Sequence, residues 1–223
     1  MTVAVSNTPS HYQLAKQHLG QMKYVHAALG FHPLAVAECY KELPLFLQLL
    51  PEAKFVGEIG LDLSTEGRTT RELQEKVFTS IIQAIGGSKK FVTIHSRGAA
   101  DEVFETLKRF DCRNVVFHWY SGSVRTLEQA VEWGCWFSVN PSMLGSQKGV
   151  DIIERIPKNR VLTETDGPYV KIGKRAAHPP DVRSVLTSLS ELWRLPESVV
   201  EQQVDHNFSK ACGDMGCGVS HQF

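Results

Sequence analysis

Short apolar stretches alternate along this chain with longer segments whose apolar residues recur at helical spacing. The short runs, many of them β-branched, predict strands at residues 2–7, 24–31, 54–61, 91–95, 114–118, 135–140 and 160–166. The longer segments between and after them predict helices at residues 36–50, 68–86, 99–110, 123–133, 146–155 and 180–210. Regular alternation of strand and helix is typical of a parallel sheet with helices packed outside it. The pattern therefore predicts an α/β fold of the TIM-barrel type.

The domain organisation is simple. No linker, low-complexity stretch or short-period repeat divides the 223 residues. This length fits one α/β barrel, so we expect a single domain over residues 1–223. The glycine-rich end of the chain, residues 210–223, is expected to form a flexible tail.

Composition narrows the choice of function. Hydrophobic residues make up 42% of the chain and charged residues 22%, which excludes an intrinsically disordered protein. Lys and Arg number 24, as do Asp and Glu, so the formal net charge is zero. No global basic field can recruit nucleic acid, and such a partner would need a local site.

The expected location is the cytoplasm. No apolar run approaches the ~18 residues of a membrane-spanning helix, so we expect no membrane association. The first residues lack a basic region followed by an apolar one, so we do not expect them to form a secretory signal. The five cysteines are odd in number and mostly scattered, as expected for reduced thiols.

Polar residues stand at the ends of most predicted strands. Glu58, His95, His118 and Asp166 each follow a different apolar run. The carboxyl ends of the strands form the active face of a parallel α/β barrel, so these side chains are expected to converge there. Carboxylate and imidazole groups suit a divalent cation such as Mg²⁺, Mn²⁺ or Zn²⁺. A single histidine at a strand end is more often a hydrogen-bonding residue, and the set of four is what favours a metal site.

Five motifs in order carry a specific family resemblance. They are Gly30-Phe31-His32-Pro33, Gly57-Glu58-Ile59-Gly60-Leu61-Asp62, Ile94-His95-Ser96-Arg97, Phe117-His118-Trp119-Tyr120-Ser121-Gly122 and Thr163-Glu164-Thr165-Asp166-Gly167-Pro168. From about residue 2 to residue 210, the sequence resembles the TatD-type metal-dependent deoxyribonucleases. Trp119, the segment 4–9 and the strand 134–139 are also similar to a shorter branch, the TatD-like nuclease of Qat anti-phage cassettes.

The resemblance implies a role for each motif residue. Glu58 would bridge two metal ions, His95 and His118 would complete the second metal site, and Asp166 would bind the first metal. Asp166 would also orient the attacking water, so Glu58 and Asp166 are the expected catalytic residues. Substrate contacts are expected from His32, Arg97, Trp119 and Ser121. The implied chemistry is hydrolysis of DNA phosphodiester bonds by a metal-activated water.

One feature departs from the family. Its members begin with a strand that ends in His-x-His and supplies two ligands of the first metal, whereas none of the nine histidines here forms such a pair. The segment 2–7 matches the family's second strand, so the first β-α unit, about 25 residues, is expected to be missing. We therefore expect one tightly bound metal in place of two. Three explanations stay open: an internal start codon, a degenerate gene, or a partner or swapped segment that fills the gap.

Several assignments stay open beside the leading one. The chain is expected to act on DNA, with partner proteins of a defence cassette. Alternatively it hydrolyses a non-nucleic-acid ester or amide, or it is a catalytically impaired pseudo-nuclease that acts as a binding module. Carboxylates expected to support the site without touching the metal are Glu38, Asp62 and Glu164. A basic loop that could contact phosphate, or remain simply solvated, contains Lys171, Lys174, Arg175 and His178.

Overall fold

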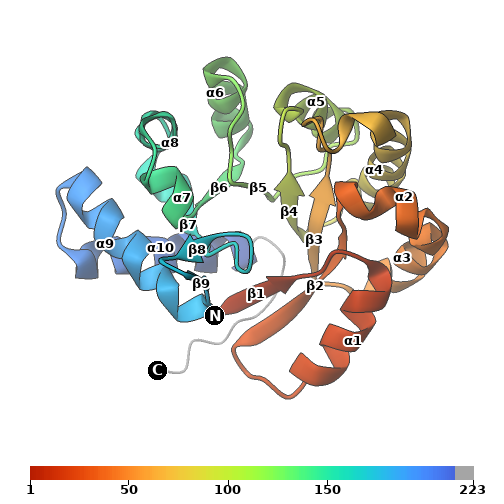
Figure 1. Ribbon diagram of the computed structural model, residues 1–223, viewed down its shortest axis with the longest axis horizontal. Coiled ribbons are helices and arrows are strands. Elements are labelled where there is room, and N and C mark those ends of the chain that lie inside the picture. The colour runs from red at the N-terminus through yellow and green to blue at the C-terminus, as the bar shows by residue number, and fades with distance from the viewer. Residues whose placement is uncertain (214–223) are drawn as a thin grey trace.

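The computed structural model describes residues 1–213 and contains one sheet of seven parallel strands in chain order. The strands are β1 (Thr2–Val5), β2 (Val25–Phe31), β3 (Phe55–Gly60), β4 (Phe91–His95), β5 (Val115–His118), β6 (Trp136–Val139) and β7 (Val161–Thr163). The sheet curls so that the strands surround an interior and the helices lie outside (Figure 1). This confirms the predicted α/β fold of the TIM-barrel type.

Helices follow most of the strands and cover the outer face of the sheet. They are α1 (Pro9–Leu19), α2 (Val36–Cys39), α3 (Leu43–Leu49), α4 (Arg71–Ile85), α5 (Ala100–Arg109), α6 (Val124–Trp133), α7 (Pro141–Leu144), α8 (Gln147–Ile153), α9 (Val182–Trp193) and α10 (Glu197–Gly213). A short antiparallel hairpin, β8 (Lys171–Ile172) and β9 (Arg175–Ala176), follows β7. Among the described residues, no helix combines the length and apolar character needed to cross a membrane.

The barrel is open along one side. Strand β1 pairs with β2, and β7 pairs with β6, but β1 and β7 do not pair with each other. A cavity of about 750 Å³ lies between them, lined by residues of both strands and of helices α9 and α10. We call this gap the seam. The sheet therefore has seven parallel strands among the described residues, and the seam separates its two edge strands.

Two apolar cores hold the fold together. The larger lies between the strands and the surrounding helices, where Val56, Ile59 and Phe117 are inaccessible to solvent. The smaller fills the amino end of the barrel interior; its members are Ala28, Phe55, Phe91, Val116, Trp136, Leu162, Ala211 and Cys212. Burial of these large side chains is the main favourable contribution to folding.

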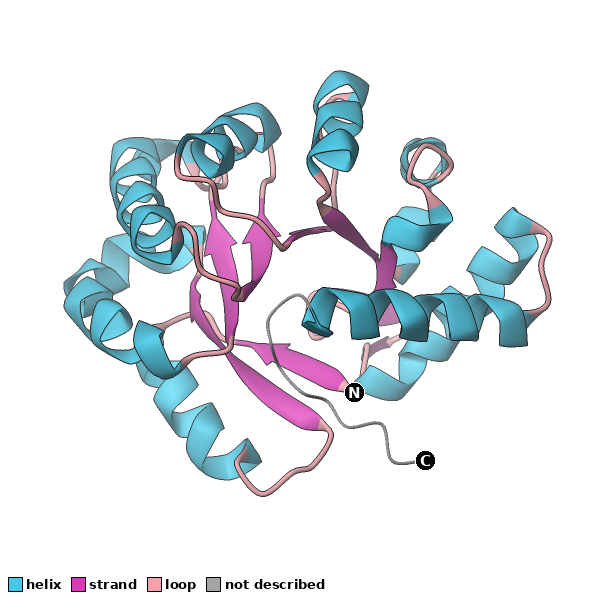
Figure 2. Cartoon of the chain, turned by 180° about the vertical axis from the view of Figure 1, so that it is seen from behind, coloured by secondary structure: helices cyan, strands magenta, loops and turns pink. Residues whose placement is uncertain are grey.

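Helix α10 closes the amino end of the barrel, which it crosses in the view of Figure 2. The side-chain amide of Asn207 donates to the carbonyls of Lys158 (2.8 Å) and Val161 (2.7 Å). That of Asn114 donates to the carbonyl of Ala211 (3.0 Å). The tail was expected to begin at residue 210, but residues 210–213 belong to this docked helix. The rest of the predicted tail, 214–223, lies outside the described residues.

Three predicted elements differ from the structure. The helix expected at 36–50 is divided into α2 and α3 by a 3₁₀ turn at Tyr40–Glu42. The helix expected at 180–210 is two helices, because Arg194 adopts a left-handed conformation (φ 54°) and Pro196 follows. The strand expected at 160–166 ends at Thr163, and the left-handed φ of Asp166 (50°) takes its side chain out of the strand pattern.

Candidate metal centre

Five side chains meet at the carboxyl end of the sheet. Glu58 lies in β3, His95 and His118 are the last residues of β4 and β5, His32 follows β2, and Asp166 follows β7. The parallel register places Gly60 beside His95, so β3 and β4 end together. Gly60 has a φ of +147°, and a Cβ there would lie 1.9 Å from the carbonyl oxygen of His95. Glycine is therefore required for this close approach of the two strands.

The carboxylate of Glu58 is the centre of the cluster. Its Oε1 lies 2.8 Å from His95 Nδ1 and 3.8 Å from His118 Nε2, and its Oε2 lies 3.9 Å from His32 Nε2. Burial alone would raise the pKa of Glu58, but His118, His95 and His32 lower the pKa to about 2. The group is thus a buried anion facing three imidazoles.

His95 is held from both sides. Its Nε2 lies 2.8 Å from Asp62 Oδ2, while its Nδ1 faces Glu58. The backbone N–H of Ser64 donates to Asp62 Oδ1 (2.9 Å), and the Asp62 side chain is 1% exposed. Burial would lower the pKa of His95, but its hydrogen bonds to the carboxylates of Asp62 and Glu58 raise it. Asp62 thus fixes the orientation of the imidazole, as residues behind metal ligands do.

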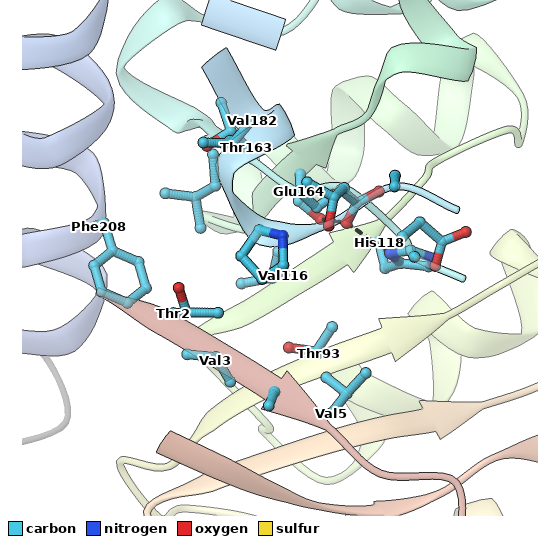
Figure 3. Close-up of a pocket in the computed structure, with 18 of the residues that line it drawn as sticks. Thr2, Val3, Val5, Thr93, Val116, His118, Thr163, Glu164, Val182 and Phe208 are labelled. Atoms are coloured by element: carbon cyan, nitrogen blue, oxygen red, sulfur yellow. Dashed lines mark hydrogen bonds and ion pairs between the residues drawn. The ribbon is translucent and has the colours of Figure 1, made fainter. Parts of the chain in front are cut away.

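A carboxylate also holds the ring of His118. Its Nδ1 lies 2.6 Å from Glu164 Oε2, and Glu164 in turn accepts hydrogen bonds from Ser138 Oγ and from Asn140 Nδ2 (3.0 Å). Figure 3 shows His118 and Glu164 side by side at one end of the seam cavity. Burial would lower the pKa of His118, but Glu164 and Glu58 raise it to about 10. Its Nε2 faces the carboxylates of Glu58 and Asp166.

Asp166 completes the cluster on the side of the seam. Its Oδ1 lies 3.4 Å from His118 Nε2. Burial raises the pKa of Asp166 to about 6 even though His118 lowers it. The carboxylates of Asp166 and Glu58 also line the seam cavity together with His118. The seam therefore opens directly onto the cluster.

This donor set fits a divalent cation. One ligand atom each from His32, Glu58 and His95 lies within 4.8 Å of the others. Imidazole and carboxylate groups are the ligands that Zn²⁺, Mn²⁺ and Mg²⁺ take in proteins. His32 itself was expected near the substrate. Its Nδ1 accepts a hydrogen bond from the backbone N–H of Leu34 (3.2 Å), which indicates that Nε2 carries the hydrogen that faces Glu58.

The remaining expected site residues are placed differently. Trp119 is 37% exposed, and its ring centroid lies 6.4 Å from that of His118, so it borders the cluster. The side chain of Arg97 is 60% exposed and lies 3.9 Å from Glu66. Ser121 meets Lys148 through its carbonyl oxygen (3.2 Å). No contact joins Arg97, Ser121 or Glu38 to the cluster among the residues that the structure describes.

Ser138 is the site residue that the sequence reasoning missed. It lies in the middle of β6, and its hydroxyl donates to Glu164. A signal was present, because Trp136, Ser138 and Asn140 alternate along the strand and share one face. A hydroxyl on the inner face of a buried strand requires a polar partner, and Glu164 is that partner.

Known proteins are similar to this chain in sequence and in fold. The chain is 25% identical over 192 residues to the uncharacterized metal-dependent hydrolase MJ1582 of Methanocaldococcus jannaschii, covering 84% of this chain and 74% of that protein. It is 26% identical over 182 residues to the human deoxyribonuclease TATDN3, covering 75% of this chain and 65% of that protein.

The solved structure of YJJV, a TatD homologue from Escherichia coli, superposes with a TM-score of 0.84 at 25% identity, over 94% of this chain and 85% of that one. The family described as TatD related DNase matches residues 1–213, which is nearly the whole chain. The protein therefore belongs to the TatD family of metal-dependent hydrolases.

Proposed function

We propose that this protein hydrolyses DNA phosphodiester bonds with a divalent cation held by Glu58, His95, His118 and Asp166. The observation that carries the proposal is the buried Glu58 carboxylate, which faces three imidazoles at the carboxyl end of the strands. The human relative is named a deoxyribonuclease, which supports DNA as the substrate class.

The protein's own residues have distinct tasks in this proposal. A bound divalent cation supplies an activated water and neutralises negative charge on the phosphate. Glu58 provides the shared negative charge, while Asp62 and Glu164 hold the two histidine rings in a fixed orientation. Asp166 lies beside His118, where its carboxylate can orient a water toward the phosphorus. His32 presents an N–H to the same space and can donate to a phosphate oxygen.

Exposed aromatic and basic groups near the cluster support a nucleic-acid substrate. Tyr169, three residues after Asp166, is 73% exposed, and Trp119 is 37% exposed. Bases stack on such side chains with little dependence on sequence. In the basic loop, both guanidinium nitrogens of Arg175 contact Asp181 (2.6 Å each), so Arg175 is engaged within the protein. The exposed Lys171 is the better candidate for a phosphate contact.

We further propose that the site as described binds one cation tightly, as Mg²⁺, Mn²⁺ or Zn²⁺. Glu58, His95 and His118 lie in paired strands, whereas a first-metal site would have Asp166 and the shared Glu58 alone. One more parallel strand, ending in His-x-His, would fit between β1 and β7 and complete that second position. Residues preceding Met1 in a longer chain, or a partner, could supply this strand. If neither does, the metal site stays incomplete, which is the pseudo-nuclease alternative.

Three finer parts complete the proposal. A role in anti-phage defence and partner proteins from the same cassette rest on the resemblance, and a cytoplasmic location rests on the scattered cysteines. The similarity of Trp119 and of the segment 134–139 to the Qat-type nuclease supports the first two.

The direct test is a digestion assay with Mg²⁺ or Mn²⁺ on single- and double-stranded DNA, run beside a panel of ester and amide substrates. The proposal expects cation-dependent DNA cleavage that disappears with chelator and in Asp166→Asn. Hydrolysis of esters without DNA cleavage would support the rival hydrolase. Cation binding without any hydrolysis, even after a His-x-His strand is supplied, would support the pseudo-nuclease.

A further inference from the structure

A second, smaller cavity lies at the amino end of the sheet, opposite the metal centre. Its volume is about 280 Å³. Its walls come from the loop before β4, the loop before β5, the end of α6 and the residue before β7. We call it the basal pocket; the lining residues that carry the argument are Ser88, Lys89, Arg113, Asn114, Trp133 and Arg160.

The charge of the basal pocket is positive. Lys89, Arg113 and Arg160 line it, and none of its described lining residues is a carboxylate. Arg113 pairs through Nε with Asp111 (2.7 Å), which lies outside the lining. Arg160 uses Nη1 to donate to the carbonyl of Gly134 (2.9 Å). Each guanidinium has five N–H groups, so both keep donors available for an anion.

Each of the two guanidinium groups lies over an aromatic ring, although the Arg113 side chain is 55% exposed. The guanidinium carbon of Arg113 lies 3.7 Å from the ring centre of Trp133. That of Arg160 lies 4.8 Å from the ring centre of Trp136. Stacked guanidinium groups lose little further freedom when they bind an oxyanion, because their planes are already oriented.

The wall of the pocket also contains polar atoms without a partner. Ser88 Oγ, Asn114 Oδ1 and Trp133 Nε1 are buried and form no hydrogen bond with the described part of the chain. Buried polar atoms are rarely left in this state, since each costs free energy unless it is paired. Two of the three can donate, and Asn114 Oδ1 can accept.

We propose that the basal pocket binds a small phosphate monoester, with Arg113 and Arg160 as its principal ligands. Paired guanidinium groups recognise phosphate oxygens by charge-assisted hydrogen bonds. The volume lies at the lower end for small-molecule sites, so it suits a phosphate with a small substituent and excludes a nucleic-acid duplex. The pocket shares no residue with the metal centre, so the inference does not depend on the proposed hydrolytic function.

The test is a titration of the chelator-treated protein with inorganic phosphate and, separately, with 2′-deoxyadenosine 5′-monophosphate. Binding is followed by calorimetry and by tryptophan fluorescence, since Trp133 and Trp136 adjoin the pocket. Saturable binding is expected, with affinity reduced at least about tenfold in Arg113→Gln and in Arg160→Gln, as for loss of a charge-assisted hydrogen bond. Tighter binding of the nucleotide than of inorganic phosphate would identify a monoester as the ligand; equal binding would identify free phosphate.

Controls separate this pocket from other causes. Arg155→Gln removes an exposed guanidinium from α8's end and should leave binding unchanged. His118→Ala disrupts the metal centre and should also leave it unchanged. Because Arg160 contacts the residue after α6, the fold of the Arg160→Gln variant is checked by circular dichroism. Lys89→Gln removes a positive charge from the pocket without breaking that contact and should also lower the affinity. Absence of saturable binding, binding unaffected in both pocket arginine variants, or an equal loss in Arg155→Gln would overturn the proposal.

Discussion

The centre of the sheet and the seam are built differently, although both border the same cluster. In β3 every residue from Phe55 to Gly60 is buried, and the strand pairs with neighbours on both sides. In β1 no residue is fully buried, and one edge of the strand faces a cavity of about 750 Å³. Glu58, His95 and His118 come from the closed part, whereas Asp166 stands at the seam. The proposed ligands Glu58, His95 and His118 thus lie on strands that are paired along both edges, whereas Asp166 does not.

Closing the seam is expected to have the largest effect. A chain extended at its start by a β-α unit of about 25 residues, whose strand ends in His-x-His, should pair the free edges of β1 and β7. We expect a rise of at least about 5 °C in Tm, which corresponds to roughly 2 kcal/mol for a domain of this size. DNA cleavage with Mn²⁺ should increase by at least about 100-fold as the second cation site is completed.

The matched control is an extension of the same length with both histidines replaced by alanine. It should raise Tm without raising cleavage. If the unextended chain already melts cooperatively and cuts DNA as fast as the extended one, the seam does not limit activity.

Two equivalent truncations compare the closed part with the seam in a single measurement. Val56 of β3 is inaccessible to solvent, while Val3 of β1 is partly buried at the edge of the smaller core. We expect Val56→Ala to lower the free energy of unfolding by about 2 kcal/mol and Val3→Ala by less than about 1 kcal/mol, because a cavity in a packed core cannot collapse. Urea unfolding gives both values, and equal losses would remove the distinction between the two regions.

The carboxylate behind His118 offers a test inside the closed part. Glu164→Gln keeps the shape of the side chain but removes the charge that faces His118 Nδ1. Affinity for Mn²⁺ or Zn²⁺ should fall by about 10- to 100-fold, as for other partners of metal-ligating histidines. Glu132→Gln, an exposed change on α6, is the matched control and should have no effect. Unchanged affinity in Glu164→Gln would show that the ring of His118 is oriented by other contacts.

Two thiols give the smallest expected effect. Burial raises the pKa of Cys112 and of Cys135 to about 12, so both stay protonated in the folded protein at pH 9. In the unfolded chain a thiol titrates near pH 8.5 and ionises above it. The folded state therefore holds more protons, and stability should fall as pH rises above about 8.5, by about 1 kcal/mol per thiol at pH 9.5.

Urea unfolding at pH 7.5 and 9.5 measures the change, and the double variant Cys112→Ala with Cys135→Ala should show less of it. In the folded protein, peptide mapping after alkylation at pH 8 should find the partly exposed Cys39 modified before the buried Cys112 and Cys135. Rapid alkylation of Cys112 would indicate that the closed part opens more readily than its packing suggests.

The fold could be predicted because its signals are local and repeated. Each buried parallel strand is a short apolar run, and its polar terminal residue marks the carboxyl end, which is why Glu58, His95 and His118 could be placed together from sequence. The division of the last helical segment into two helices was not predicted. Pro196 is a signal for it, but the left-handed residue Arg194, at which α9 ends, carries none of its own. Helix α10 was expected to stop early, since a glycine-rich segment does not reveal the docking of Ala211 and Cys212 into the barrel.

The sequence indicated which residues meet at the cluster, but not which side chains contact each other there. Glu164 and Asp166 belong to one predicted motif and both line the seam cavity, although β7 ends before them at Thr163. The contacts of Glu164 with His118 and of Asp62 with His95 could not be predicted. They depend on strand register and loop conformation, which arise only from tertiary packing. Arg97 shared a motif with His95 but leaves the end of β4 on a loop toward Glu66. Neighbours in sequence at a strand end therefore need not share a site.

The central claim is that Glu58, His95 and His118 bind a divalent cation. Calorimetric titration of the chelator-treated protein with Mn²⁺ or Zn²⁺ tests it most directly, with Glu58→Gln and Trp119→Phe titrated in parallel. We predict about one tight equivalent, estimated from the number of ligands present, that is lost in Glu58→Gln and retained in Trp119→Phe. Two tight equivalents in the unextended chain, or full affinity in Glu58→Gln, would contradict the account.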